Sequence, residues 1–513
     1  MLSNIILNVL AVFASTAAAG PTWRTSSGEA LVQYLKRQTR PLNFTVSPEA
    51  SIVYPDSAEW DNATARWSSW SAPSYSIAFI PAEPEDLSIG LRYMSSNNIS
   101  YLAMGGGHGN TITLGTVEDA VLINMERFDH ITMNDCDHTI TVGGGARFGP
   151  VYTVAYNAGR ELPLGSCACV GVGGATLGGG HSRLQGVYGM IADGIVSMRV
   201  ALWDGTIVEA SATHNPDLFW AMRGAGHNFG IVLDFTFRTY PLRNNGLTYN
   251  ADMTFTGDSI EGIFTAINEL IPDQDPALAI DVFILTNRTS YEPIVYLNLV
   301  YHGTQEDGDR YTSRFATTTN STGHHIERLW LNVTMTPWEQ ITHVAAGGMI
   351  DHACTQGPHY NVYTSSMRQF DVAQQRELYD SYVEFVRENP LLVGSLILHE
   401  IFGQRAVVEQ PAEETAIGNR DSANILTILQ TTYTDESLEP VADAFVRSWR
   451  DQLVDPQHSG YDIQSIYVNY AHGDEPLESM YGYEPWRLER LRSLKQRYDP
   501  HGFFNHYNSV LQE

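Results

Sequence analysis

The residues best placed to do chemistry are a histidine inside a run of glycines and two cysteines two positions apart. The run AMGGGHGNT, residues 103–111, carries His108. Cys167 and Cys169 open a second stretch, residues 165–189, in which nine of 25 residues are glycine, against 43 of 513 in the whole chain. Glycine lets another group approach the backbone, and successive exposed N–H groups then bind anions. Two such loops predict an extended groove for a long ligand that carries a diphosphate.

The two glycine loops allow other interpretations. The chain has no G-x-x-x-x-G-K-[ST], and GVGGAT lacks the third glycine of G-x-G-x-x-G, so neither a Walker nor a Rossmann site is predicted. A metal site would use His108, Cys167, Cys169 and His181, but C-x-C with distant histidines is a poor zinc spacing. Tight turns around inert, buried thiols stay an alternative. We favour an organic, tethered ligand, and we predict no metal.

Short apolar runs separated by turns characterise residues 75 to 245. Alternating Val, Ile and Leu segments bounded by Gly and Asp-Gly predict strands and hairpins. Two helices are expected, one at residues 83–98 with acidic residues in its first turn, and one at residues 215–226 that begins after Asn-Pro and ends at glycine. The first glycine loop follows a predicted strand at residues 99–104.

The pattern changes after residue 246. Strands such as residues 279–287 and 293–303 alternate with amphipathic stretches such as residues 374–389 and 438–454. This predicts an antiparallel sheet with helices on one face. The fold class is therefore α+β, with two domains.

Composition limits the partners. The chain has 30 basic and 58 acidic residues, a net charge of −28 and 43% hydrophobic residues. A surface of this charge repels phosphate backbones and anionic membranes, so we predict neither a nucleic-acid nor a membrane partner. After the first residues, no apolar run approaches the roughly 18 residues of a spanning helix. A small-molecule substrate fits better.

The first residues indicate export. An apolar stretch at residues 5–14 is followed by Ala17-Ala18-Ala19, a small-residue cleavage site. This predicts a signal peptide at residues 1–19 and a protein that is secreted or lies in the secretory lumen. The stretch lacks Lys and Arg, so a packed or disordered N-terminus stays an alternative. Six glycosylation sequons agree with export: Asn43, Asn62, Asn98, Asn287, Asn320 and Asn332.

Four cysteines are too few for a disulfide scaffold. They lie at positions 136, 167, 169 and 354. If one of them is engaged elsewhere, at most one disulfide can form among the other three, and one thiol is left over.

The motifs resemble those of the vanillyl-alcohol-oxidase superfamily of FAD-linked oxidoreductases, and within it the fungal berberine-bridge-like oxidases. In that family a G-G-H histidine bonds the flavin 8α-methyl group, and GGGHGN places this role on His108. The cysteine of C-x-x-V-G-x-G-G bonds flavin C6, and CACVGVGG places this role on Cys167. NPDLFWAMRGAGHNFGIV, YVNY and RYDPHGFF extend the resemblance over nearly the whole mature chain. It implies covalently bound FAD, and we favour two bonds, through His108 and Cys167, over a single bond through His108.

The resemblance also implies domain boundaries and binding residues. The boundaries are 20–246 for an FAD-binding domain, with a PCMH-type core at about 73–243, 247–464 for a substrate domain, and 465–513 for a C-terminal segment that returns to the FAD domain. The implied cofactor-binding residues are His108, Cys167, Gly105, Gly106, Gly107, Gly109, Asn110, Val170, Gly171, Gly173, Gly174, Gly178, Gly179, Ile231 and Asn469.

The implied catalytic base is Tyr470, with Tyr467 nearby. An unperturbed tyrosine titrates near 10, so a base role requires a cationic or hydrogen-bonding partner. Tyrosines packed at a domain interface are the alternative. Four polar residues could line the substrate face, although such strand residues more often bond locally: His399, Glu400, Asn419 and Arg420.

The resemblance implies an oxidase. It would take a hydride from a small-molecule alcohol, amine or ring C–H, while a base removes a proton and O₂ is reduced to H₂O₂. A small valine at Val170 accompanies oxygen access in the family. We expect a role in fungal secondary metabolism. A secreted oligosaccharide oxidase that makes lactones and a non-redox binding module on a flavoprotein fold stay open as alternatives.

Overall fold

The computed structural model describes residues 42–288, 290–319, 323–422 and 424–511. All elements below belong to the unit that begins at Phe44. The predicted signal peptide, residues 1–19, and the sequon at Asn320 lie outside the described residues.

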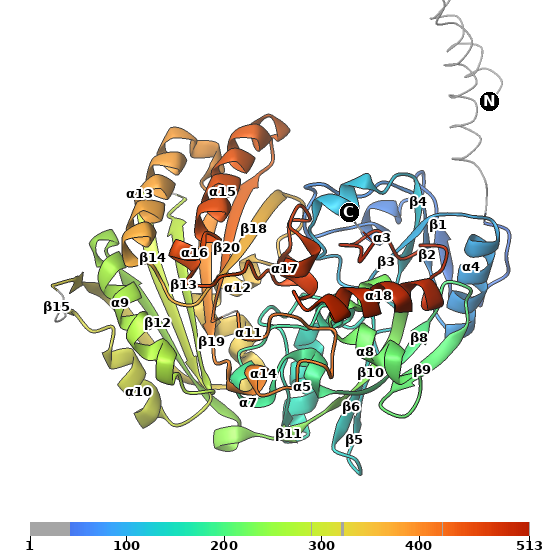
Figure 1. Ribbon diagram of the computed structural model, residues 1–513, viewed down its shortest axis with the longest axis horizontal. Coiled ribbons are helices and arrows are strands. Elements are labelled where there is room, and N and C mark those ends of the chain that lie inside the picture. The colour runs from blue at the N-terminus through green and yellow to red at the C-terminus, as the bar shows by residue number, and fades with distance from the viewer. Residues whose placement is uncertain (1–41, 289, 320–322, 423, 512–513) are drawn as a thin grey trace, which may run out of the picture. The chain divides into compact units, whose positions relative to one another are not determined.

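A four-stranded sheet positions the first glycine loop (Figure 1). Its elements are β1 (Ser51–Val53), β2 (Tyr75–Ile80), α4 (Pro84–Ser96), β3 (Tyr101–Met104) and β4 (Ala120–Asn124). The strand order is β1-β2-β4-β3, and β4 runs parallel to both β2 and β3. Helix α4 begins at a proline and packs Leu87, Leu91 and Met94 against the sheet, because their spacing of four and three residues puts them on one face. The chain leaves β3 at the edge where the glycines begin.

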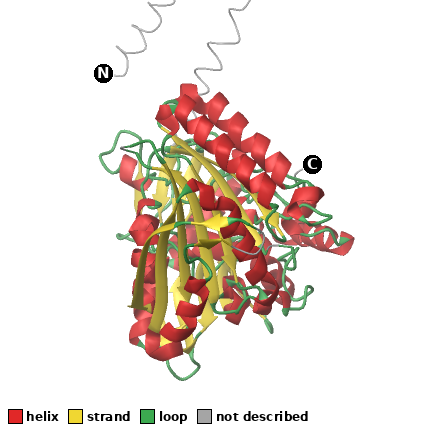
Figure 2. Cartoon of the chain, turned by 90° about the vertical axis from the view of Figure 1, so that its left-hand side faces the viewer, coloured by secondary structure: helices red, strands yellow, loops and turns green. Residues whose placement is uncertain are grey.

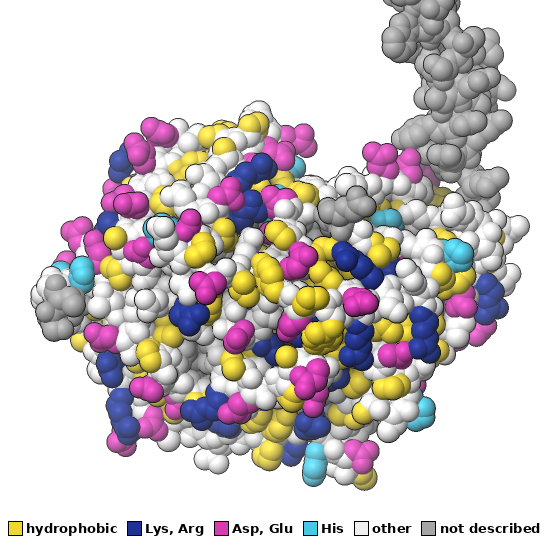
Figure 3. Space-filling view, in the orientation of Figure 1, with side chains coloured by type: hydrophobic (Ala, Val, Ile, Leu, Met, Phe, Trp, Pro, Cys, Tyr) yellow, Lys and Arg dark blue, Asp and Glu magenta, His cyan; other side chains and the backbone are white. Residues whose placement is uncertain are grey.

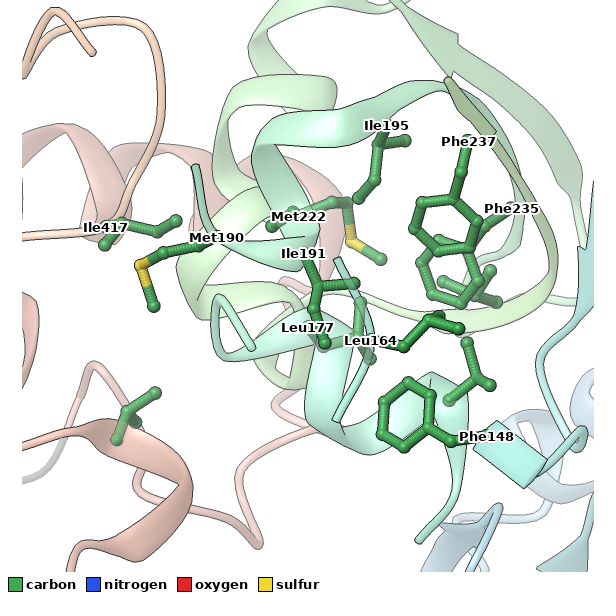
Figure 4. Close-up of a cluster of buried hydrophobic side chains, with 14 of the residues drawn as sticks. Phe148, Leu164, Leu177, Met190, Ile191, Ile195, Met222, Phe235, Phe237 and Ile417 are labelled. Atoms are coloured by element: carbon green, nitrogen blue, oxygen red, sulfur yellow. The ribbon is translucent and has the colours of Figure 1, made fainter. Parts of the chain in front are cut away.

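A second, antiparallel sheet supports the other glycine-rich stretch. Its strands are β5 (Ile131–Asn134), β6 (Thr139–Gly143), β8 (Ile195–Ala201), β9 (Ile207–Ser211) and β10 (Ile231–Arg238), in the order β5-β6-β10-β8-β9. The helices packed on it are α5 (Phe148–Asn157), α6 (Val172–Leu177) and α8 (Pro216–Ala225). Figure 4 shows Phe148, Leu177 and Met222 from these helices beside Ile195 and Phe235 from the strands. This core holds the stretch from Cys167 to Gly179 against the sheet.

The largest sheet has seven strands and is antiparallel throughout. They are β12 (Leu247–Phe255), β13 (Leu278–Thr286), β14 (Pro293–Tyr301), β17 (Arg328–Pro337), β18 (His359–Met367), β19 (Leu396–Phe402) and β20 (Ile425–Tyr433), in the order β17-β12-β14-β13-β19-β20-β18. Figures 1 and 2 show helices along one of its faces. These are α9 (Ile260–Leu270), α13 (Val372–Glu388) and α15 (Glu439–Leu453). The predicted α+β class, with helices on an antiparallel sheet, is confirmed.

Strand register puts a row of polar residues on the other face of this sheet. Asp252 lies opposite Asn298, Asn298 opposite Asp281, and Asp281 opposite Glu400. Directly opposite residues project from the same face, and their chain neighbours project from the other. Ile280, next to Asp281, belongs to the core under the helices. The polar row therefore faces away from α9, α13 and α15.

The C-terminal residues pack on the first half of the chain. They form η11 (Val468–Tyr470), α17 (Leu477–Tyr481) and α18 (Pro485–Tyr498), and α18 lies beside α8 (Figure 1). Lys495 Nζ donates to the carbonyl of Asn228 at 2.7 Å and pairs with Asp499 at 2.7 Å, with both charges buried. These bonds tie the end of α18 to Asn228 in the first half of the chain. The domain boundaries given by the sequence resemblance stay predictions.

The exposed surface carries both signs of charge. Figure 3 shows Lys and Arg side chains scattered among Asp and Glu on one face. Within the described ranges, every helix is too short or too polar to cross a bilayer.

We predict that acid destabilises the fold through its buried histidines. His302 and His399 are buried, and burial lowers the pKa of each to about 3. Because the unfolded chain takes up these protons near pH 6.5 and the folded chain does not, the free energy of unfolding falls as pH drops below 6.5. The slope is about 1.4 kcal/mol per pH unit for each group. Melting temperature measured from pH 7 to pH 4 checks this.

His399→Leu is expected to reduce the slope of the free energy of unfolding against pH by the contribution of one proton. His214→Leu, at an exposed site, is the matched control. Equal slopes for both variants and the wild type would contradict the assignment.

Candidate functional site

The first glycine loop uses its carbonyl groups and leaves its N–H groups free. Arg66 donates to the carbonyl of Gly109, and Arg147 Nη1 donates to the carbonyl of Gly106 at 3.2 Å. In the described part of the chain, the backbone N–H groups of residues 105–110 have no hydrogen-bond partner. A row of free N–H groups with two cations beside it favours an anionic ligand.

His108 projects from this loop into an aromatic stack. Its ring lies 5.4 Å from that of Trp67, which stacks at 4.3 Å on Tyr360 from β18. Burial, together with the charges of Arg147 and Arg66, lowers the pKa of His108 to about 4. The imidazole is therefore neutral at ordinary pH. A neutral ring has the free nitrogen lone pair that bond formation to carbon requires.

The two glycine loops touch backbone to backbone. A Cβ atom on Gly106 would lie 2.3 Å from the nitrogen of Gly171, and a Cβ atom on Gly171 would lie 2.3 Å from the nitrogen of Gly106. A side chain at either position would displace the other loop. Both glycines are therefore required by this close approach.

The structure places the predicted cofactor residues on four segments. Gly105, Gly106, Gly107, His108, Gly109 and Asn110 form the first loop, Cys167, Val170, Gly171, Gly173, Gly174, Gly178 and Gly179 belong to the second glycine stretch, Ile231 begins β10, and Asn469 lies in η11. Asn469 joins two of these segments, because its Nδ2 donates to the carbonyl of Ala175 at 2.8 Å and a Cβ atom on Gly178 would lie 2.1 Å from its Oδ1. Ile231 is buried in the five-stranded sheet. The binding roles stay predictions.

Cysteine pairing agrees with the count made from sequence. Cys169 and Cys354 form a disulfide, and Cys136 and Cys167 are free thiols. Cys136 is exposed, whereas Cys167 is partly buried against the core. Burial raises the pKa of Cys167 to about 12, Arg183 opposes this, and Glu400, Asp281 and Asp351 add to it. The thiol is thus protonated at ordinary pH.

Tyr467 and Tyr470 lie together on the C-terminal segment, with ring centroids 5.0 Å apart. The Tyr467 hydroxyl accepts a hydrogen bond from the N–H of Gly180 at 3.2 Å, and the Asn469 side chain donates to it at 2.6 Å. Burial, with smaller contributions from Glu400 and Tyr467, raises the pKa of Tyr470 well above its ordinary value. A tyrosine base would need a cationic partner, whereas the neighbour that affects the pKa of Tyr470 most is the Glu400 carboxyl group. Tyr470 is therefore a hydrogen-bond donor at ordinary pH.

Three ionisable residues, Arg183, Asp281 and Glu400, lie together near these tyrosines. Arg183 Nη2 pairs with Asp281 Oδ2 at 2.8 Å, both nearly fully buried. Glu400 lies beside Asp281 in the polar row, and its Oε2 is buried with no hydrogen-bond partner. Burial and the nearby Asp281 raise the pKa of Glu400, and Arg183 opposes this. Glu400 also contributes to the raised pKa values of Cys167, Tyr467 and Tyr470, so its carboxyl group lies near all three.

The other polar residues considered from sequence have different surroundings. His399 projects from the opposite face to Glu400, where Phe264 and Phe370 meet it edge-on and its Nδ1 shares a 2.9 Å hydrogen bond with the Thr427 hydroxyl. It contributes to the helix-covered core and does not face the tyrosines.

Asn419 and Arg420 border a pocket of about 40 Å³ next to Tyr467. Asn419 donates to the carbonyl of Ser479 at 3.0 Å, and Arg420 pairs with buried Asp193 at 2.7 Å. Both side chains are therefore held by local bonds.

Arg183 and Asp281 are not among the residues predicted from the sequence. A charged residue in the apolar strand AIDVFILT is a signal for Asp281, since an unpaired carboxylate there would be costly. Arg183 lies within the second glycine stretch, two residues after His181, and its spacing alone does not identify its partner.

The donor set fits the FAD that the sequence resemblance implies. Free N–H groups at residues 105–110 and the bare backbone at Gly106 and Gly171 would receive a diphosphate. The neutral imidazole of His108 and the free thiol of Cys167 would be available for covalent bonds.

Comparisons with known proteins identify the family. A family model for an FAD binding domain matches residues 75–211, and a model named "Berberine and berberine like" matches residues 466–511. The FAD-linked oxidoreductase azaL of Aspergillus niger is 32% identical over 464 residues, covering 89% of this chain and 95% of azaL.

Two solved structures share the fold. BBE-like 1 of Physcomitrella patens superposes with a TM-score of 0.77 at 20% identity, covering 91% of this chain and 98% of its own. The glucooligosaccharide oxidase of Acremonium strictum, described with a 6-S-cysteinyl, 8α-N1-histidyl FAD, gives a TM-score of 0.71 at 21% identity, covering 90% and 97%.

Proposed function

Because this chain belongs to the berberine-like family of FAD-linked oxidoreductases, we propose that it is an oxidase of a small-molecule alcohol, amine or ring C–H. The acceptor is O₂, H₂O₂ is released, and the reaction belongs to fungal secondary metabolism. One observation carries the proposal: the Glu400 carboxyl, which has a buried oxygen without a hydrogen-bond partner, lies close enough to Tyr467, Tyr470 and the Cys167 thiol to raise the pKa of each.

The chain supplies attachment and proton transfer, while a bound FAD supplies the acceptance of a hydride. His108 and Cys167 hold the cofactor by covalent bonds, and the free N–H groups of residues 105–110 receive its diphosphate. Covalent attachment prevents loss of the cofactor from an exported protein.

Glu400 accepts the substrate proton. Its raised pKa brings it toward the operating pH, which is where a general base is most effective. Arg183 and Asp281 set its charge, since the guanidinium opposes the effect of the second carboxylate on the pKa of Glu400. Tyr470 stays protonated and orients the substrate oxygen or nitrogen by donating a hydrogen bond. The base role that the sequence resemblance gave to Tyr470 thus passes to Glu400, and Tyr470 keeps a catalytic role.

Peroxide release tests the function. Purified protein in air-saturated buffer is offered benzylic alcohols, benzylic amines and phenolic alkaloids in one set, and cellobiose, maltose and chito-oligosaccharides in another. We expect turnover in the first set, with Glu400→Gln as the matched variant that keeps the yellow colour and loses the activity.

The remaining outcomes separate the alternatives. Robust turnover of the sugars alone would replace the metabolite proposal with an oligosaccharide oxidase. Bound flavin that neither substrates nor dithionite can reduce would support the non-redox module.

We also propose export through the secretory pathway. The sequons Asn62, Asn98, Asn287 and Asn332 are exposed, which supports the proposal because glycan addition requires an accessible side chain.

A further inference from the structure

The segment between β17 and β18 leaves the large sheet and packs on the part of the chain that carries the two glycine loops. This covering segment, residues 338–357, contains η7 (Trp338–Gln340), α11 (Ile341–Val344), η8 (Ala345–Gly348) and α12 (Met349–His352). Trp338 meets Tyr152 of α5 with ring centroids 4.5 Å apart, and both lie in the hydrophobic core around Phe148. The covering segment therefore lies against the helix that begins beside Cys167.

Two hydrogen bonds and a disulfide are among the bonds that hold the covering segment in place. Near its middle, the N–H of Gly347 donates to Asp252 Oδ1 of the polar row at 3.1 Å. At its end, the N–H of Gly357 donates to the carbonyl of Trp67 at 3.1 Å. Between them, Cys354 forms the disulfide with Cys169. Of these three bonds, the disulfide is the one that reaches the second glycine stretch.

Helix α5 holds the other side of the loop that carries Cys167 and Cys169. The N–H of Gly149 donates to the carbonyl of Ala168 at 2.9 Å, and the N–H of Phe148 donates to the carbonyl of Val170 at 3.1 Å. The backbone around Cys169 is thus held, and its side chain is occupied by Cys354. Cys167 is the one cysteine of this loop with a free thiol.

One turn of the covering segment acts on both cysteines. The N–H of Cys354 donates to the carbonyl of Asp351 at 3.1 Å, so these two residues form a single turn. Cys354 bonds Cys169, while the charge of Asp351 contributes to the raised pKa of Cys167. Cys167 and the disulfide therefore lie beside the same turn.

We propose that the Cys169–Cys354 disulfide directs covalent flavin attachment to Cys167, by occupying the only other sulfur on its loop. This inference rests on the proposed covalent link at Cys167. In the attachment step the S–H bond of Cys167 and the C6–H bond of the flavin are replaced by one S–C6 bond. The two protons and two electrons released stay on the flavin ring until O₂ removes them as H₂O₂. With Cys169 reduced, two thiols two residues apart would compete for the same carbon, or oxidise to each other.

The test compares two variants that both lack the disulfide. All proteins carry His108→Ala, so that acid-stable flavin reports the cysteine bond alone. Cys354→Ser frees the Cys169 thiol, whereas Cys169→Ser with Cys354→Ser removes it, and the two differ by a single atom at position 169. Trypsin releases residues 161–183 as one peptide, and tandem mass spectrometry locates the flavin on Cys167 or Cys169.

We expect the double serine variant to carry flavin on Cys167 at the level of the His108→Ala parent. In Cys354→Ser, the flavin on Cys167 should fall by about twofold or more, with the balance on Cys169 or lost to a Cys167–Cys169 disulfide. A purely structural role would lower both variants equally. Equal Cys167 flavin in the two variants overturns this inference and leaves the proposed link intact. Absence of acid-stable flavin already in the His108→Ala parent overturns the link and the inference together.

Discussion

After acid precipitation, the double variant His108→Ala, Cys167→Ala is expected to release all of its yellow colour into the supernatant, whereas the wild type keeps its colour in the pellet. Acid unfolding breaks every non-covalent contact but leaves C–N and C–S bonds intact. The neutral imidazole of His108 and the free thiol of Cys167 lie on two loops that touch at Gly106 and Gly171. One flavin can therefore reach both.

Each single variant is expected to keep its colour in the pellet, because one bond is enough for retention. Cys136→Ser, which removes the exposed free thiol, is the matched control and should behave as the wild type. Colour lost from the His108→Ala variant alone would show a single bond through the histidine. Colour lost from the wild type would show that neither bond forms.

The His108 bond and the Cys167 bond differ in how far the protein prepares the reacting side chain. Burial keeps His108 unprotonated and ready to react, but burial and three carboxyl groups keep the Cys167 thiol protonated. Thiolate is the reactive form, so the cysteine bond should form more slowly than the histidine bond. A time course of acid-stable flavin in Cys167→Ala and His108→Ala proteins reads the two steps separately.

Local sequence was sufficient for the glycine loops and insufficient for the charged cluster. GGGHGN and CACVGVGG identify their residues because the chemistry needs those types at adjacent positions. Arg183, Asp281 and Glu400 are each isolated in sequence, and only the pairing of β13 with β19 brings the two carboxyl groups together. A shift of one residue in that register would turn Glu400 into the helix-covered core and His399 toward the tyrosines.

The disulfide could not be predicted from the sequence either, because its two cysteines are brought together only by the fold. Cys169 and Cys354 are 185 residues apart, and the four cysteines allowed several pairings. What selects this pair is the path of the covering segment, which depends on Trp338 entering a core built by residues near Phe148. The fold class was predictable because strand alternation and helix amphipathicity repeat over many residues. The contacts between the covering segment and the core near Phe148, by contrast, depend on single residues.

Glu400→Gln is expected to reduce the rate of flavin reduction by about 100- to 10,000-fold, the usual effect of removing a general base. The amide keeps the shape of the side chain and cannot accept the substrate proton. The rate is measured under anaerobic conditions by following the loss of yellow colour, with the substrate found by peroxide release. Tyr470→Phe removes an orienting hydroxyl and should lose less, about 10- to 100-fold.

The pH profile distinguishes a base from a binding residue. Since burial and Asp281 raise the pKa of Glu400, the wild-type rate should increase with pH through a value above the ordinary range of a glutamate, as the carboxylate forms. In Glu400→Gln this increase should disappear, whereas Tyr470→Phe should keep it at a lower rate. His399→Leu, whose side chain lies on the opposite face of the same strand, is the matched control and should leave the profile unchanged. A Glu400→Gln variant that retains the wild-type increase would return the base role to Tyr470, because the titrating group would then be one that the substitution left in place.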